Sequence, residues 1–259
     1  MSLFFDNFKR TILKKDRVRN SLCFLRAIYF CKIKKSIKDY NEISEHTWKN
    51  TLPSNKRVVF NEKINLPKHP SAKRIFNVGK SLSGSKAKWL INAITSKHDY
   101  QKFKQIKILS IGPRSEGEIF LLYAYGFEME NISAIDLFSY SPLIELGDMH
   151  KLNFENESFD IVILGWCLAY SNNKKKVISE VRRVLKEKGS IIIGHTFQKK
   201  TDEEIIKERG YLVGSPYSKI KDKEDLQKLL SNEKFEEFYS KKINSSVNSR
   251  IVYGATKRY

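Results

Sequence analysis

From residue 106 onward the sequence alternates short apolar runs with helical patterns, and this alternation restricts the fold more than any other feature. "IKILSIG" at 106–112 is followed by further runs at 132–137, 159–165 and 189–197. Between the last two, apolar residues recur at helical spacing from Val177 to Leu185, and Gly189 is the expected stop of that helix. Buried strands separated by helices are typical of a parallel sheet in an α/β layer fold.

The end of the chain departs from this pattern. Two strand-like runs, 235–243 and 249–257, are separated only by "NSSVN", which predicts a terminal antiparallel hairpin. A chain of 259 residues with 41% hydrophobic content can bury a sizeable core. We predict one folded domain over residues 81–259. Residues 1–80 are interpreted as a basic helical N-terminal extension and a linker arm, since residues 50–74 contain three prolines.

The longest apolar tract lies in that extension. "LCFLRAIYFCKI" at 22–33 is too short to span a bilayer and contains Arg26, so we expect no transmembrane helix. The N-terminus also lacks the order of regions that marks a secretory signal, which favours a cytoplasmic location. Cys23, Cys31 and Cys167 have no spacing that holds zinc or builds a disulfide framework, and we expect no metal site.

The stretch "SIGPRSEGE" at 110–118 leads from the first strand into a helix. A glycine turn at a helix N-terminus presents backbone N–H groups to an anionic ligand group. Pro113 and Arg114 stand where a dinucleotide pyrophosphate needs close approach of the backbone, so a nicotinamide enzyme is disfavoured, whereas a smaller carboxylate-bearing cofactor fits. The alternative is a plain strand-to-helix turn with no ligand.

Two further motifs follow neighbouring strands. Asp136 lies 24 residues beyond Gly112, at a strand end where an acid can accept both hydroxyls of a ribose. The segment "LGDMHKLNFENESFDIVILGW" at 146–166 resembles class I S-adenosylmethionine-dependent methyltransferases: a strand ends in Gly-Asp-x, Leu-x-Phe follows, and Ser-Phe-Asp opens the fourth strand. The resemblance covers residues 106–197, and the terminal hairpin extends it to the C-terminus.

The resemblance implies a Rossmann-like, mostly parallel seven-stranded sheet with an antiparallel terminal strand, and a methyltransferase domain over residues 81–259. It also implies S-adenosylmethionine as the cofactor. The loop would face the methionine part of the cofactor, and Asp136 would hold the ribose. Asp148 and the Met149 backbone would read the adenine amino edge, with Trp166 near the adenosyl group or the substrate entrance. The complete cofactor-binding set is Gly112, Pro113, Arg114, Glu116, Gly117, Asp136, Leu137, Asp148, Met149 and Trp166.

The sequence departs from the family in two places. Many members begin the loop with Asp or Glu where this chain has Ser110, so Glu116 or Glu118 is a candidate partner for the cofactor ammonium. Either glutamate could instead favour the positive N-terminus of the helix. Only 11 residues separate Asp136 from Asp148, which reduces the second crossover helix to about a turn and leaves one side of the cleft more open.

Methyl transfer from a sulfonium is an in-line displacement, so most of the catalysis can come from positioning and desolvating the nucleophile. A base is needed only for a protonated acceptor, and the candidates are His195, His150 and Tyr170, with His195 the first choice. Structural roles are the alternative for all three. "GWCLAY" at 165–170 differs from the Asn/Asp-Pro-Pro-aromatic signature of amino-group methyltransferases, which favours a hydroxyl of a small molecule or surface sugar as acceptor.

The positive charge is concentrated in the N-terminal part. The chain has a net charge of +19, and residues 1–105 hold 24 Lys/Arg against 7 Asp/Glu. A basic helical segment with long apolar side chains favours an anionic membrane surface or a lipid-linked glycan, at the inner face of the membrane. Nucleic acid is a less favoured partner. A helical cap that exposes a basic face is the third interpretation.

Two alternatives to a small-molecule or glycan methyltransferase stay open at the level of sequence. An RNA methyltransferase would use the N-terminal charge as its binding surface. A catalytically silent module would bind the cofactor or dock to a membrane without turnover.

Overall fold

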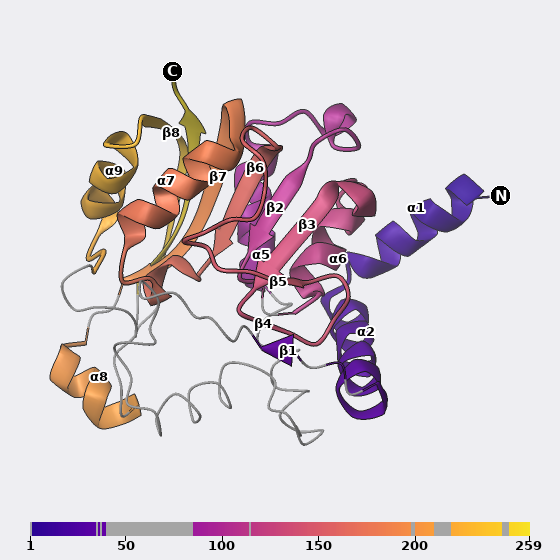
Figure 1. The fold of residues 1–259 in the computed structure, drawn as a ribbon. Helices are drawn as coiled ribbons and strands as arrows, with labels where there is room; N and C mark the ends of the chain where they lie inside the picture. Colours follow the sequence, from indigo (N-terminus) through magenta and orange to yellow (C-terminus); the bar gives the residue numbers. More distant parts are fainter. Residues whose placement is uncertain are drawn as a thin grey trace.

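The computed structural model describes residues 2–34, 36, 38–39, 85–113, 115–197, 200–209, 219–244 and 249–259. The predicted linker arm at 50–74, the predicted domain boundary at residue 80 and Arg114 lie outside the described residues. Between 85 and 259 the described residues form an α/β domain, and two helices precede it (Figure 1).

The centre of the domain is a seven-stranded sheet with the order β5-β3-β2-β6-β7-β9-β8. All neighbours run parallel except β9, which is antiparallel to both β7 and β8. The fold class and the terminal hairpin predicted from the sequence are confirmed. In sheet order, the strands are β5 (Glu145–Leu146), β3 (Ile132–Asp136), β2 (Ile108–Ile111), β6 (Phe159–Gly165), β7 (Leu185–Phe197), β9 (Ser249–Lys257) and β8 (Phe235–Asn244).

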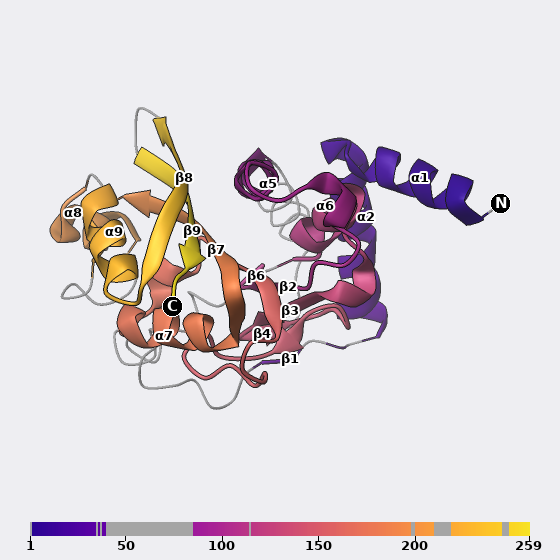
Figure 2. The ribbon, with the colours of Figure 1, turned by 90° about the horizontal axis from the view of Figure 1, so that it is seen from above.

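Helices cover both faces of the sheet, as the view from above shows (Figure 2). On one face lie α5 (Ser85–Thr95) and α6 (Gly117–Ala124), and on the other α7 (Lys174–Val184) and α9 (Lys223–Ser231). Helix α8 (Asp202–Arg209) lies at the edge of the domain (Figure 1). Each face buries its own hydrophobic cluster because the central strands are apolar on both sides, as expected of a covered parallel sheet.

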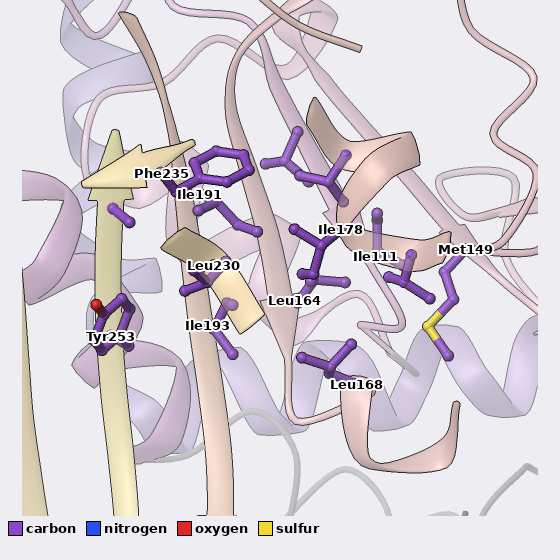
Figure 3. Close-up of a cluster of buried hydrophobic side chains, with 14 of the residues drawn as sticks. Ile111, Met149, Leu164, Leu168, Ile178, Ile191, Ile193, Leu230, Phe235 and Tyr253 are labelled. Atoms are coloured by element: carbon purple, nitrogen blue, oxygen red, sulfur yellow. The ribbon is translucent and has the colours of Figure 1, made fainter. Parts of the chain in front are cut away.

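The cluster on the α7 and α9 face is the larger of the two (Figure 3). Ile191 and Ile193 of β7 pack with Leu164 of β6, Ile178 of α7 and Leu230 of α9, and all five are at most 1% exposed. Burying each such side chain adds about 1.5–3 kcal/mol to the free energy of unfolding, relative to leaving the side chain exposed. The opposite cluster joins α5 and α6 to β2, β6, β7 and β9.

The helical spacing predicted from Val177 onward is confirmed, but the predicted stop is wrong. Helix α7 ends at Val184, and Leu185 has the extended backbone of β7 (φ −77°, ψ 133°). The side chain of Leu185 is fully buried, so it packs into the core as a strand residue. Lys188, with φ 60°, precedes Gly189 within this connection.

Residues 137–144, all of them described, contain no helix between β3 and β5. They hold β4 (Phe138–Ser139), which pairs with β1 (Lys38–Asp39) in a separate two-stranded sheet, and a turn. The reduced second crossover predicted from the spacing of Asp136 and Asp148 is therefore confirmed. The remaining short elements are the 3-10 turns Tyr100–Lys102, Met129–Asn131 and Leu168–Tyr170.

The N-terminal helices lie against α6 rather than on the sheet (Figures 1 and 2). They are α1 (Ser2–Leu13), α2 (Asp16–Ile28) and the π-helical turn Tyr29–Ile33 that continues α2. Leu13 and Cys23 are buried with Phe120 and Ala124 of α6. The predicted helical extension is confirmed for these residues, and no helix in the described part of the chain is long and apolar enough to cross a membrane.

Candidate cofactor site

The carboxyl ends of β2, β3 and β6 meet at the centre of the sheet, where β2 has β3 on one side and β6 on the other (Figure 1). The connections leaving β2 and β6 diverge at this point, and ligands of open α/β sheets bind in the crevice that results. Three predicted site residues follow these strands: Gly112 after β2, Asp136 at the end of β3 and Trp166 after β6.

Gly112 makes a turn that a larger residue could not make. Its φ is +70°, and a Cβ atom on it would lie 2.6 Å from Cβ of Cys167. Its N–H donates to the Ile135 carbonyl of β3 at 2.8 Å, and the Cys167 thiol donates to the Ile111 carbonyl at 3.2 Å. The turn is thereby fixed between the ends of β3 and β6, and the chain then enters α6 through Pro113, Ser115 and Glu116.

The two glutamates beside this loop lie in different surroundings. Glu116 is fully buried, and both of its oxygens are engaged by Arg26 of α2, at 2.7 and 2.8 Å. The Ser141 hydroxyl also donates to this carboxylate, and the Tyr140 hydroxyl accepts from the Glu116 N–H at 3.4 Å. The carboxylate of Glu116 is thus fixed by a residue of the N-terminal helix α2.

Glu118 lies one residue inside α6, and its carboxylate accepts from the Ser110 hydroxyl at 2.6 Å. A Cβ atom on Gly165 would lie 3.0 Å from Oε2 of Glu118, so this carboxylate also adjoins the end of β6. Burial raises the pKa of Glu118 to about 7, although the Ser110 hydrogen bond acts in the opposite direction. Ser110 and Glu118 together supply an acidic group at the end of β2, where the family commonly has an acid on the strand itself.

Asp136 and Asp148 lie at the ends of neighbouring strands. Asp136 is half-buried, and its carbonyl accepts from the Gly147 N–H at 3.0 Å, so the pairing of β3 with β5 extends to the residue before Asp148. Leu137 is half-buried beside it, whereas Met149 is buried, with its side chain in the core cluster (Figure 3).

A buried hydrogen-bonded chain holds Asp148. Its Oδ1 lies 2.9 Å from the donating His150 N–H and 2.6 Å from His150 Nδ1, and His150 Nε2 lies 2.7 Å from the Ser171 hydroxyl. All three side chains are at most 2% exposed. The order Asp-His-Ser matches a nucleophilic triad, but Ser171 is fully buried and its oxygen accepts from the Asn173 N–H at 3.0 Å. The chain therefore orients Asp148 and leaves no access for a substrate at Ser171.

Trp166 has a left-handed backbone, with φ 64°, which is rare for a residue other than glycine. Its N–H donates to the Gly194 carbonyl of β7 at 2.9 Å, and its ring lies over Gly194 and 6.2 Å from the Trp89 ring. Among the described residues, the buried Nε1 of Trp166 has no hydrogen-bond partner. Strained backbone at the end of a central strand is characteristic of functional sites.

The predicted base candidates are unequally accessible. His195 is 3% exposed, and burial, followed by the Lys174 charge, lowers its pKa to about 4. The Lys174 ammonium donates to the Ser171 carbonyl at 2.8 Å, and burial lowers its pKa to about 8. Tyr170, in the turn after β6, is half-buried. No group of three or more metal-binding side chains occurs within the ranges that the structure describes.

Residues 126–193 match the family model described as a methyltransferase domain. Among solved structures, the PH0226 protein of Pyrococcus horikoshii is 20% identical with a TM-score of 0.50, and the alignment covers 68% of this chain and 93% of that one. A phosphoethanolamine N-methyltransferase of Haemonchus contortus, solved with phosphomonomethylethanolamine and S-adenosylhomocysteine, is 12% identical with a TM-score of 0.52. That alignment covers 66% of this chain but only 53% of the enzyme.

Residues 126–193 therefore match a methyltransferase domain, and the sheet that contains them has the fold of class I methyltransferases.

One curated relative, the uncharacterized protein MJ1123 of Methanocaldococcus jannaschii, is 46% identical over 43 residues, which are 17% of this chain and 21% of that protein. The family match contains the strand ends with Asp136, Asp148 and Trp166. The loop at 112–117 and the N-terminal helices lie outside it.

Three contacts around the candidate site were not predicted from the sequence. Ser171 orients His150, Arg26 holds Glu116, and Lys174 influences His195. The contact between Ser110 and Glu118 did leave a signal in the sequence, because Ser110 stands where many family members have an acid and two glutamates, Glu116 and Glu118, follow it closely.

Proposed function

We propose that this methyltransferase binds S-adenosylmethionine at the carboxyl ends of β2, β3 and β5 and transfers its methyl group to a hydroxyl oxygen. The acceptor class is a small molecule or a surface sugar. The observation that supports the proposal most is that three acids occupy three neighbouring strand ends. Glu118 is joined to Ser110 of β2, Asp136 ends β3, and Asp148 follows β5 with His150 bonded to it.

The chemistry of these groups fits the cofactor. A buried carboxylate such as Glu118 suits an ammonium, Asp136 suits a diol, and Asp148 suits an aromatic amine. The turn at Gly112 and the N-terminus of α6 suit a carboxylate. The cofactor supplies a methyl group activated by a sulfonium, and the protein's task is to align the acceptor oxygen and exclude water.

If the acceptor must lose a proton, we propose that the base is one of the three candidates His195, His150 and Tyr170. Tyr170 is the least buried of them. His195 is neutral near pH 7 because its pKa is lowered to about 4, which makes it a weak proton acceptor. His150 has both ring nitrogens in the chain that orients Asp148. Of the three candidates, Tyr170 is therefore the most accessible to an acceptor.

Calorimetric titration with S-adenosylhomocysteine tests the cofactor proposal. We expect the native chain to bind, and Asp136→Ala and Asp148→Ala each to weaken binding at least about tenfold, because each removes one of the few polar contacts that orient the ligand. Asp160→Ala is the matched control, since this acid lies at the opposite end of β6 and is paired with Lys186. Failure of the native chain to bind would refute the cofactor proposal, and unchanged affinity in both variants would refute the residue assignment.

The acceptor class is tested by turnover. The purified enzyme should convert S-adenosylmethionine to S-adenosylhomocysteine with hydroxylated small molecules or glycans, and mass spectrometry should place the added methyl on oxygen. Methylation of a nitrogen, or of RNA, would contradict the acceptor proposal and leave the cofactor proposal intact. No turnover with any acceptor would favour the silent module.

We also propose that the N-terminal helices dock on an anionic lipid surface, at the cytoplasmic face of a membrane. Four large apolar side chains lie along one side of α2 and its continuation, at intervals of seven, four and four residues, and we name them the α2 stripe. They are Val18 (38% exposed), Leu25 (63%), Tyr29 (41%) and Ile33 (67%). Long apolar side chains are needed to enter a lipid interface and are unnecessary for binding phosphates.

The charges around the α2 stripe favour the same partner. Five exposed basic residues lie on or beside the two helices: Lys9 in α1, Lys14 and Lys15 between the helices, Arg17 in α2, and Lys34 directly after the π-helical turn. Asp6 and Asp16 are each in an ion pair, with Arg10 and with Arg19 and Lys88, so they offset little of this charge toward a surface. Each basic residue near an anionic leaflet contributes about 1 kcal/mol to the free energy of binding to the membrane.

Vesicle sedimentation distinguishes this surface from a nucleic-acid site. The native chain should bind vesicles of phosphatidylglycerol and phosphatidylcholine, and Leu25→Ser with Ile33→Ser should reduce binding. Tyr259→Ser, at an exposed aromatic on the other terminus, should not. Equal vesicle binding by native and double-variant chains, or preferential retention on RNA with a steep salt dependence, would contradict the lipid proposal.

A further inference from the structure

Arg26 links the N-terminal extension to the candidate cofactor loop across 90 residues of sequence. Its Nε and Nη2 each donate to one oxygen of Glu116, at 2.7 and 2.8 Å. This fork-to-fork arrangement requires the planar guanidinium, since a lysine ammonium cannot bridge both oxygens in the same way. The contact is a geometrically specific pairing of two side chains.

The surroundings of the pair restrict its geometry. The Arg26 guanidinium lies 5.1 Å from the Phe30 ring centroid and 5.6 Å from that of Phe120, and the hydrogen bond to Glu116 raises the pKa of Arg26. Phe30 continues from α2 and Phe120 belongs to α6, so the guanidinium is held by both helices. Glu116 is 0% exposed, so loss of Arg26 would remove the cationic partner of a buried carboxylate.

Glu116 occupies the last position before α6, directly after the turn made by Gly112 and Pro113. Its backbone carbonyl accepts from the Phe120 N–H at 2.9 Å, as the first bond of the helix. Ser141 and Tyr140, in the short crossover between β3 and β5, contact the same residue. Glu116 is therefore the point where the extension, the loop and the crossover meet.

We propose that Arg26 is a positioning residue of the cofactor site. Through Glu116 it holds Ser115 and the first turn of α6, beside the turn at Gly112, in the form whose N–H groups meet the carboxylate of the cofactor. The extension is then a component of the methyl-donor site, and displacement of α2 weakens cofactor binding. This inference rests on the proposed function, because the loop must face S-adenosylmethionine.

Arg10 provides a matched control within the same extension. It joins α1 to the far end of α6, where its guanidinium donates to the Tyr123 and Phe127 carbonyls at 2.5 and 3.1 Å and to Glu128 at 2.9 Å. Both arginines attach an N-terminal helix to α6, but only Arg26 contacts the loop. A purely structural role would make the two equivalent for ligand binding.

The test compares S-adenosylhomocysteine affinity and thermal unfolding for the full-length native chain, Arg26→Lys, Glu116→Gln, Arg10→Lys and the double variant Arg26→Met with Glu116→Gln. We expect Arg26→Lys and Glu116→Gln to raise Kd about tenfold, within the usual range of couplings between separate sites. Arg10→Lys should lower the unfolding temperature and leave Kd within about twofold. In turnover, the Arg26 variant should raise KM for S-adenosylmethionine while kcat at saturation changes little.

The double variant separates positioning from stability. Removing both charges leaves no unpaired buried carboxylate, so its unfolding temperature should recover toward the native value. Its affinity for S-adenosylhomocysteine should stay about tenfold reduced. Native-like affinity in the double variant, or an equal loss in Arg10→Lys and Arg26→Lys, overturns the proposal. Absence of binding by the native chain would instead overturn the proposed function.

Discussion

Glu118 supplies, at the end of β2, the carboxylate that Ser110 lacks. Ser110 is too short to present a negative charge, but its hydroxyl donates to a carboxylate that α6 carries to the same place. The carboxylate sits among apolar neighbours, and burial raises its pKa to about 7. A group that is costly to ionise in the folded protein is well suited to meet a cation that arrives with a ligand.

Glu118→Gln should therefore change the pH dependence of stability. The folded pKa of about 7 lies above the ordinary value of 4.5, so the unfolded state ionises first as the pH rises. Ionisation of Glu118 alone therefore lowers the stability of the native protein between pH 4.5 and 7, by up to about 3 kcal/mol. His98 and His195, whose pKa values burial lowers to about 4, act in the opposite direction over the same pH range. Chemical denaturation at pH 4.5 and pH 8 should show the Gln variant gaining stability relative to the native chain as the pH rises, because the two proteins share the histidine contribution and differ only at Glu118.

Exposed Glu155→Gln is the control and should keep the native profile. The Glu118→Gln protein should be more stable than the native protein at pH 8 and bind S-adenosylhomocysteine more weakly. A parallel pH dependence in the native protein and the Glu118→Gln variant would show that the pKa of this carboxyl group is the same in the folded and unfolded chains.

His150 was predicted as a base, and its two hydrogen bonds favour an orienting role for Asp148 instead. His150→Gln should raise the Kd for S-adenosylhomocysteine several-fold, since Asp148 loses its partner, while the pH profile of kcat keeps its shape. His98→Gln removes a half-buried imidazole that is hydrogen-bonded to Ser190, and it should leave Kd unchanged. Loss of the acidic limb of the kcat profile in His150→Gln would instead identify it as the base.

The connections between elements decide how the site is assembled. The strand-to-helix turn after β2 and the short crossover between β3 and β5 were readable from glycine placement and from the spacing of Asp136 and Asp148. The end of α7 was not, because Leu185 continues the helical apolar pattern and is used by β7 instead. An apolar residue at such a junction satisfies both patterns, and only packing decides between them.

Gly112→Ala tests the β2 to α6 connection. A left-handed backbone costs about 1–2 kcal/mol for a residue with a side chain, and the added methyl would also overlap Cys167. We expect lower stability in urea denaturation together with a clear loss of S-adenosylhomocysteine affinity.

Gly126→Ala is the counterpart at the other end of α6, where φ is +117° and the nearest atoms are 3.4 Å away in Tyr100. It should be destabilised by backbone strain and retain ligand affinity. If both variants lost affinity alike, general loosening of α6 would explain the result better than the turn itself.

Across the whole molecule, the sequence predicted the α/β domain, its terminal hairpin and the helical extension, because each depends on local periodicity. It could not predict that Arg26 meets Glu116, or that Asp148, His150 and Ser171 form one chain, since such pairs depend on distances in space. The extension was interpreted as a cap, a membrane segment or a nucleic-acid surface. The structure shows α1 and α2 packed on α6 and the α2 stripe exposed.

Hydrogen exchange measured by mass spectrometry should show α2 and α6 opening together. A 13-residue helix is marginal alone, so protection of α2 depends on its contacts with α6. We expect peptides from 19–28 and from 117–124 to exchange at similar rates, and Arg26→Lys to accelerate both. Rapid exchange of α2 alone, in a chain whose α6 is protected, would show that the extension opens independently.

The 90-residue separation of Arg26 and Glu116 also has a consequence for synthesis. At about 5–20 residues per second, the ribosome adds Glu116 roughly 5 to 18 seconds after Arg26, and α6 is completed later still. Until then the nascent N-terminal segment has no docking helix, and its basic and apolar side chains meet whatever surface lies near the exit tunnel. Contact of this segment with a surface can therefore precede folding of the domain against which it packs.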